Sequence, residues 1–88
     1  MKAVIFTRGR SANKQIEICE EYAMLNGIEV IYIARSEQEL TRFVLSGNVD
    51  CVIVSHASRI SRRMNEYIET EKMFNKFGVT LLAAGVTI

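Results

Sequence analysis

Five arginines gather in two short segments of the chain, and their side chains could bind an anion. The segments are residues 1–14 and 55–63, and the arginines are Arg8, Arg10, Arg59, Arg62 and Arg63. A guanidinium group carries a planar fork of donors that matches the oxygens of a phosphate group. Arg59 and Arg62 are three residues apart, so on a helix they project from the same side. These residue types and this spacing predict a phosphate-binding site.

The distribution of charge agrees with a localised site. The 88 residues have a net charge of +1, but the two segments hold seven of the eleven basic residues and none of the ten acidic ones. A basic patch on an otherwise acidic body attracts anions such as nucleic acid. Two other interpretations stay open, namely an ion-pair network between the arginines and glutamates, and arginines that are merely solvated at the start of a helix.

Apolar runs that alternate with amphipathic segments predict the elements that position these arginines. Strands are expected over 2–7, 28–34, 49–55 and 79–84, and helices over 14–27, 36–48 and 62–78. Because the strands are almost continuously apolar, they predict an α/β fold in three layers, with a parallel sheet of about four strands covered by about three helices. Ligands bind at the carboxyl ends of such strands. If strands 2–7 and 49–55 are neighbours, the arginines converge on one rim of the sheet.

Local signals predict where the helices begin and end. Ser11 is expected to cap the first helix, and the pair Asn26-Gly27 to end it. Ser36 followed by Glu39 is a capping signature for the second helix, and Gly78 is expected to end the third.

The spacing of apolar residues predicts which helix faces are buried. In the first helix a stripe is expected to face the core, made of Ile16, Ile18, Cys19, Tyr22, Ala23, Leu25 and Asn26. In the third helix the residues expected in the core are Met64, Tyr67, Ile68 and Phe74.

Several classes of protein are excluded by composition. No apolar stretch approaches the ~18 residues of a membrane span, and "MKAVIFTRGR" (1–10) lacks the features of a signal peptide, so we expect a cytoplasmic protein. Cys19 and Cys51 are expected to be buried free thiols, and His56 a loop or strand-end residue. We therefore expect neither a metal site nor a cofactor.

At the arginines the chain resembles the catalytic domain of the serine site-specific recombinases, the resolvases and invertases. In that family an early strand ends in Tyr-Ala-Arg-Val-Ser-Thr, and "FTRGRS" (6–11) stands in the same place here. The segment "VDCVIVSHASRISR" (49–62) is similar to the family's strand followed by Leu-Asp-Arg-Leu-Ser-Arg, and Arg-Ile-Ser-Arg is its most specific part. The helix and strand in "QIEICEEYAMLNGIEVI" (15–31) and in "MNEYIETEKMFNKFGVTLLAAG" (64–85) follow in the family's order.

The resemblance implies active-site roles for some residues, and it implies that other active-site residues of the family are replaced in this chain. Arg8, Arg59 and Arg62 correspond to active-site arginines, the last two of which grip the scissile phosphate. The nucleophilic serine falls two residues after the first arginine, where this chain has Arg10, and the acidic residue before the arginine pair is here Ser58. The family's further arginine, in an Asp-Arg-Pro-like stretch, has no matching motif. Because strand exchange proceeds through a covalent phosphoserine, we expect no recombination.

Ser11 is only a weak candidate for the nucleophile. It lies one residue beyond the expected position, and near a strand end one step turns a side chain toward the opposite face. Its expected role is therefore the helix cap.

The resemblance also implies a single resolvase-like domain over residues 1–88, without the family's long oligomerising helix and DNA-binding part. We accordingly expect a monomer or a weak dimer. The final "AAGVTI" (83–88) resembles the start of a further strand, which favours truncation. Two origins of the chain stay open, a fragment of a longer recombinase and a relic gene.

Three functions follow as hypotheses. The first is an inactive recombinase-like domain whose arginines bind the DNA backbone weakly and without sequence specificity. The second is a protein interaction module, an accessory or regulator of a full-length recombinase, that does not bind DNA itself. The third is a small nucleotide-binding domain, but "TRGRSANK" (7–14) has neither Gly-x-Gly-x-x-Gly nor the Walker pattern. No two carboxylates are expected at the rim, which argues against acid–base catalysis.

Overall fold

The computed structural model describes residues 1–85, in which strands and helices alternate. The elements are β1 (Lys2–Phe6), α1 (Ala12–Leu25), β2 (Glu29–Ala34), α2 (Glu37–Ser46), β3 (Cys51–Val54), the 3₁₀ helix η1 (Ala57–Arg59), α3 (Met64–Lys76) and β4 (Thr80–Ala83). The sequence predicts all of them except η1. The further strand expected at the end of the chain involves residues 86–88, which lie outside the described residues.

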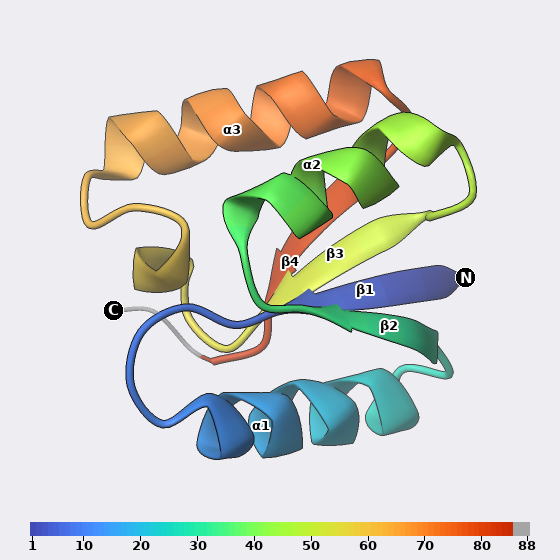
Figure 1. Ribbon diagram of the computed structural model, residues 1–88, viewed down its shortest axis with the longest axis vertical. Coiled ribbons are helices and arrows are strands. Elements are labelled where there is room, and N and C mark those ends of the chain that lie inside the picture. The colour runs from blue at the N-terminus through green and yellow to red at the C-terminus, as the bar shows by residue number, and fades with distance from the viewer. Residues whose placement is uncertain (86–88) are drawn as a thin grey trace.

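The four strands form one parallel sheet in the order β2-β1-β3-β4. β1 is central and pairs with both β2 and β3, so the prediction that strands 2–7 and 49–55 are neighbours is confirmed. All strands point the same way, and their carboxyl ends therefore meet at one edge of the sheet (Figure 1).

Helices cover both faces of the sheet, which confirms the three-layer α/β architecture. Connections between parallel strands are right-handed, so the reversal of strand order after β2 puts α1 on one face and α2 and α3 on the other. Figure 1 shows this arrangement. Side chains of a strand point alternately to the two faces, and in β1 Ala3 and Ile5 belong to the cluster under α1 whereas Val4 and Phe6 belong to the cluster under α2 and α3. Burial on both faces explains why the two inner strands, β1 and β3, are apolar almost throughout.

The buried face of α1 is narrower than predicted. Gln15, Cys19 and Ala23 are its buried residues, four positions apart, while Leu25 is 74% exposed and Ile18 is 38% exposed. The expectation that Ile18 and Leu25 face the core is therefore wrong. A helix lying alone on one face of a small sheet contacts it along one ridge, and residues beside that ridge stay in solvent.

The apolar stripe of α3 is likewise only partly buried. Phe74 is in the core and Tyr67 packs against it, but Met64 is 57% exposed and Ile68 is 40% exposed. The prediction of a core position is wrong for these two residues. Met64 and Ile68 are four positions apart, so they lie on the same side of α3, and that side is exposed to solvent.

Both cysteines are buried free thiols, as predicted. Burial raises the pKa of the Cys19 thiol to about 12, with a smaller contribution from Glu20, and also raises the pKa of Cys51. Both are therefore thiols and not thiolates at neutral pH, and they act as small core residues. Among residues 1–85 no helix is both long enough and apolar enough to span a membrane.

Candidate phosphate-binding site

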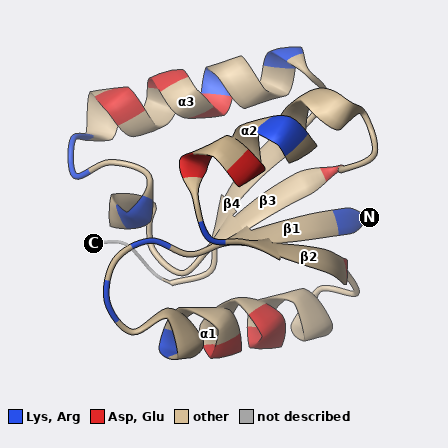
Figure 2. Cartoon of the chain, in the orientation of Figure 1, with Lys and Arg blue, Asp and Glu red and all other residues tan. Residues whose placement is uncertain are grey.

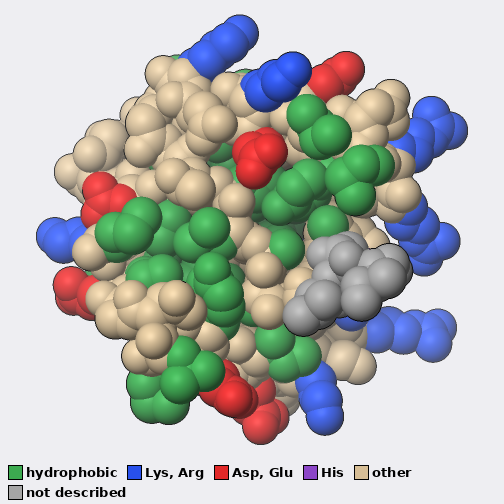
Figure 3. Space-filling view, turned by 180° about the vertical axis from the view of Figure 1, so that it is seen from behind, with side chains coloured by type: hydrophobic (Ala, Val, Ile, Leu, Met, Phe, Trp, Pro, Cys, Tyr) green, Lys and Arg blue, Asp and Glu red, His purple; other side chains and the backbone are tan. Residues whose placement is uncertain are grey.

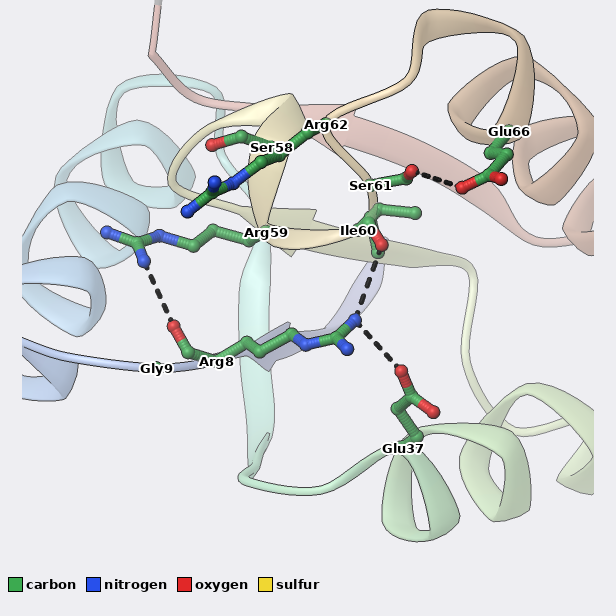
Figure 4. Close-up of a pocket in the computed structure, with 9 residues that line it drawn as sticks. All are labelled: Arg8, Gly9, Glu37, Ser58, Arg59, Ile60, Ser61, Arg62 and Glu66. Atoms are coloured by element: carbon green, nitrogen blue, oxygen red, sulfur yellow. Dashed lines mark hydrogen bonds and ion pairs between the residues drawn. The ribbon is translucent and has the colours of Figure 1, made fainter.

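Two loops meet at the carboxyl edge of the sheet and enclose a cleft. One loop follows β1 and the other, containing η1, follows β3, and they are neighbours because these strands are paired. The cleft has a volume of about 580 Å³, and we call it the arginine cleft after its lining residues Arg8, Gly9, Glu37, Ser58, Arg59, Ile60, Ser61, Arg62 and Glu66 (Figure 4). Figure 2 shows basic segments in the β1–α1 loop, in η1 and just before α3, around this edge.

A buried glutamine fixes the loop after β1. The Gln15 side chain accepts a hydrogen bond from the Arg8 N–H at 3.1 Å, and its Nε2 donates to the carbonyl oxygens of Arg8 at 2.9 Å and Arg10 at 2.7 Å. Gln15 is only 2% exposed, so these bonds are shielded from water. Its spacing of four from Cys19 was the signal that could have placed it on the buried ridge.

The same loop turns through left-handed backbone at two residues. Gly9 has φ 78° and Ser11 has φ 61°. A Cβ on Gly9 would lie 3.5 Å from Nη1 of Arg59, an ordinary contact, so the positive φ is what favours glycine there. Ser11 stands at the N-cap position of α1, but its side chain makes no capping hydrogen bond, and the prediction of a cap is wrong in this respect. A capping serine has extended backbone, and the left-handed conformation of Ser11 does not provide it.

Arg59 ties the two loops together. Its Nη1 donates to the carbonyl oxygen of Arg8 at 3.1 Å, across 51 positions of sequence. Its Nε is buried and has no hydrogen-bond partner among the residues that the structure describes. A buried N–H without a partner loses its hydration, and an acceptor placed beside it would restore a hydrogen bond.

The three cleft arginines differ in their charge partners. Arg8 Nη1 lies 2.9 Å from Oε1 of Glu37 and 3.4 Å from the carbonyl oxygen of Ile60. Within residues 1–85, no carboxylate forms an ion pair with Arg59 or Arg62. In Figure 4 the side chains of Arg59 and Arg62 extend in one direction and Arg8 extends in the other, toward Glu37. The cleft therefore has one end with uncompensated positive charge and one end with a neutralised arginine.

The first turn of α2 positions Glu37. Ser36 caps the helix by accepting a hydrogen bond from the N–H of Glu39 at 3.2 Å, as the capping signature predicts. The Glu39 carboxylate accepts from the hydroxyl of Tyr32 at 2.7 Å and from the N–H of Arg35 at 3.0 Å. These bonds lower the pKa of Glu39, with the Tyr32 hydroxyl as the largest cause, and raise the pKa of Tyr32. Together they fix the start of α2 against the end of β2.

The remaining polar groups of the cleft are paired locally. The Ser61 hydroxyl donates to Glu66 at 2.6 Å and accepts from the N–H of Arg63 at 3.1 Å, and Arg63 lies 3.7 Å from the same carboxylate. His56 immediately precedes η1 and caps it, with Nδ1 accepting from the N–H of Ser58 at 3.1 Å and lying 2.8 Å from the hydroxyl of Ser58. His56 is thus a strand-end residue that caps a turn.

Comparison with solved structures relates the fold to other proteins. The C-terminal catalytic domain of ISC1926 TnpA, an IS607-like serine recombinase, matches with a TM-score of 0.81 and 22% identity, over 98% of this chain and 69% of that chain. The N-terminal catalytic domain of TP901-1 integrase matches with a TM-score of 0.79 and 23% identity, over 96% of this chain and 77% of that chain. A resolvase family site-specific recombinase from Streptococcus pneumoniae matches with a TM-score of 0.80 and 20% identity, over 96% and 72%.

This chain has the fold of a serine recombinase catalytic domain. No protein-family model matches the sequence, and no curated protein sequence matches it.

On this serine recombinase fold, the structure brings together only some of the predicted site residues. Arg8, Arg59 and Arg62 line the arginine cleft, whereas Arg10 and Arg63 are exposed beside it and do not line it. Arg10 occupies the loop between Gly9 and Ser11, where the resemblance places the recombinase nucleophile. Within residues 1–85 no group of three His, Cys, Asp or Glu side chains is arranged to hold a metal ion.

Two expectations about the site are wrong. The sequence predicts that the third helix begins at Arg62, but α3 begins at Met64, so Arg62 lies in the segment before it and Arg59 lies in η1. The rim does contain two carboxylates, Glu37 and Glu66. Glu37 belongs to α2, which follows β2, and it lies 29 positions after Arg8 in the sequence. The spacing of residues along the sequence does not predict a contact of this kind.

Proposed function

We propose that this chain is a serine recombinase-like domain that binds a phosphate group of DNA in the arginine cleft and does not exchange strands. The observation that supports binding is that Arg8, Arg59 and Arg62, which the resemblance assigns to the active site, line one cleft. Arg59 and Arg62, the pair that the resemblance assigns to the phosphate, form no ion pair with a carboxylate of residues 1–85. A planar guanidinium group can donate two parallel hydrogen bonds to two oxygens of one phosphate group. Loss of catalysis follows from Arg10 at the position of the nucleophile, because a guanidinium cannot form the phosphoserine intermediate.

Binding of this kind is expected to be weak and unspecific for sequence. Phosphate contacts position a protein on DNA but do not read its bases, and their affinity falls steeply as salt rises. The domain would therefore act as an accessory, alone on DNA or beside a full-length recombinase.

The test is fluorescence anisotropy of a labelled DNA duplex at two salt concentrations. The variant Arg59→Ala/Arg62→Ala is compared with Arg35→Ala/Arg42→Ala, which removes the same charge from residues that do not line the cleft. We expect the first variant to lose about tenfold or more in affinity, as the loss of two charge-assisted contacts implies, and the control to bind like the wild type. Circular dichroism checks that both are folded. Equal losses in the two variants, or no binding by the wild type at low salt, would refute the proposal.

Exposed apolar side chains support a second candidate, a protein interaction module. Met24 is 73% exposed beside Leu25 at the end of α1, and Figure 3 shows hydrophobic side chains open on one face of the molecule. The same view shows Lys and Arg side chains projecting along one edge. A stable dimer by light scattering, together with no DNA binding, would favour this function.

A nucleotide that raises the melting temperature of the domain by several degrees would instead favour the third hypothesis, a nucleotide-binding domain.

A further inference from the structure

A second cavity adjoins the arginine cleft. It has a volume of about 220 Å³ and shares the lining residues Arg8, Glu37 and Ile60 with the cleft, so the two cavities meet at these residues. We call it the helix cavity, because α2 and α3 supply most of its other lining residues, which are Phe6, Leu40, Thr41, Thr70, Met73 and Phe74. We propose that the helix cavity holds the unpaired base of a DNA strand whose phosphate lies in the arginine cleft. This inference rests on the proposed phosphate binding and names single-stranded DNA as the preferred ligand.

Most of the side chains that line the helix cavity are apolar. Phe6, Leu40 and Phe74 are buried members of the core cluster under α2 and α3, and Met73 is half exposed at the surface. Aromatic side chains bind the face of a base whatever its identity, and a methionine side chain adapts to the shape of a ring. The lining therefore suits a flat ring system and not a second phosphate.

The volume limits the occupant to a small group. Pockets for drug-sized ligands span about 300–1,000 Å³, whereas the helix cavity has about 220 Å³. A single base is of this size, but a base pair is not. A base in a duplex is stacked and paired, so it can enter only after it has been turned out of the helix, at a cost in free energy that a single strand avoids.

Charge assigns the phosphate and the base to different cavities. Arg59 and Arg62 line the arginine cleft but not the helix cavity, and neither forms an ion pair with a carboxylate of residues 1–85. The phosphate is therefore held in the arginine cleft. The arginine of the helix cavity, Arg8, is paired with Glu37, which leaves this cavity for an uncharged group.

Arg8 lies where the cavities meet and can contact the ligand without leaving its partners. Its Nη1 lies 2.9 Å from Oε1 of Glu37 and donates to the carbonyl oxygen of Ile60 at 3.4 Å (Figure 4). A guanidinium group has five N–H donors, and within residues 1–85 those on Nε and Nη2 of Arg8 have no hydrogen-bond partner. They can donate to the ligand while the ion pair stays intact.

The experiment measures the anisotropy of three labelled DNA ligands of equal length, namely a single strand, a strand of abasic residues and a duplex. The two strands carry the same phosphates and differ only in the bases that could enter the helix cavity. We expect the abasic strand to bind about fivefold or more weakly, the lower end of what the stacking of one base contributes. The duplex should also bind more weakly than the single strand, whereas binding through phosphates alone would favour the duplex for its higher density of charge.

The variant Met73→Ala tests the cavity itself. Its matched control is Met24→Ala, since Met24 is an exposed methionine of α1 that lines neither cavity. Met73→Ala should bind the normal strand about threefold more weakly, the size of a contact between methionine and a ring, and should bind the abasic strand like the wild type. The control should bind both strands like the wild type.

A competition separates a DNA strand from a free nucleotide as the source of the base. A deoxynucleoside monophosphate should displace the labelled strand at lower concentration than deoxyribose 5-phosphate, because only the former has a base. It should still bind less tightly than the strand, which adds further phosphates. If the monophosphate binds as tightly as the strand, the ligand is a free nucleotide, and the assignment to single-stranded DNA is wrong.

The outcomes separate this inference from the proposed function. Equal binding of the normal and abasic strands by the wild type overturns the inference while the proposed function stands, and so does a Met73→Ala variant that treats both strands alike. If the wild type binds none of the three DNA ligands at low salt, the proposed function fails, and the inference fails with it.

Discussion

Gln15 is the residue that sets the shape of the loop after β1. Its side chain has three hydrogen bonds to the backbone of Arg8 and Arg10, and it is buried on the ridge of α1 that faces the sheet. Backbone groups inside a protein need partners, and the loop supplies none of its own at these positions. The conformation of the loop therefore depends on one side chain from the following helix.

The variant Gln15→Leu tests this dependence. It keeps the approximate volume of the side chain but leaves the N–H of Arg8 and the carbonyl group of Arg10 without a partner, and it leaves the carbonyl group of Arg8 with only its hydrogen bond from Arg59. We expect the free energy of unfolding, measured with urea, to fall by about 2 to 3 kcal/mol. The exposed Gln38 offers a matched control, and Gln38→Leu should change the same quantity by less than about 0.5 kcal/mol. If the two variants unfold at the same urea concentration, the hydrogen bonds of Gln15 do not hold the loop.

At the scale of the elements, the site is built from the ends of β1, β2 and β3 and the beginnings of α2 and α3. The loops after β1 and β3 supply the arginines, and α2, which follows β2, supplies Glu37. The first turn of α2 is anchored by the Ser36 cap and by the Tyr32–Glu39 hydrogen bond. The geometry of the Arg8–Glu37 pair is thus a property of how α2 begins.

Removal of the cap should therefore weaken both the helix and the fold. Ser36→Ala leaves the N–H of Glu39 without its acceptor, and we expect a loss of about 1 kcal/mol in the free energy of unfolding. For a domain of this size the melting temperature should fall by about 4 to 8 °C. Ser36→Asp keeps an acceptor at the same position and should melt close to the wild type. If Ser36→Asp melts as low as Ser36→Ala, the hydroxyl contributes by something other than capping.

At the scale of the whole molecule, charge is separated between one edge of the sheet and the rest of the surface. Arg10 and Arg63 do not line the cleft but are exposed beside it, so they can attract DNA without contacting the bound phosphate. Long-range attraction between a basic edge and DNA depends on ionic strength, whereas pairing of guanidinium and phosphate inside a cleft is screened less.

The dependence of binding on salt should separate these contributions. The slope of log K against log salt should be about −0.9 for each phosphate that is neutralised. Arg10→Ala/Arg63→Ala should reduce the magnitude of this slope by up to about 2. Lys72→Ala/Lys76→Ala removes the same charge from the second half of α3 and should leave the slope unchanged. An unchanged slope in the arginine variant would show that Arg10 and Arg63 neutralise no phosphate of the DNA.

The architecture could be predicted from the sequence because it depends on local patterns. Continuous apolar runs such as residues 51–54 are buried on both faces, and only a parallel sheet covered by helices provides such positions. The same patterns put the arginines at carboxyl strand ends. The detail of helix burial could not be predicted, because whether Ile18 or Met64 reaches the core depends on the angle at which the helix meets the sheet.

What the sequence by itself determined is therefore the order of strands and helices, the free buried cysteines and the arginines that stand at the carboxyl edge. Only the tertiary structure decided which arginines share a cleft, that Gln15 shapes their loop, and that Glu37 is the partner of Arg8. The physical reason is the range of the interactions. Strand and helix patterns arise from neighbours along the chain, whereas the Arg59–Arg8 and Arg8–Glu37 contacts join segments that meet only when the sheet has assembled.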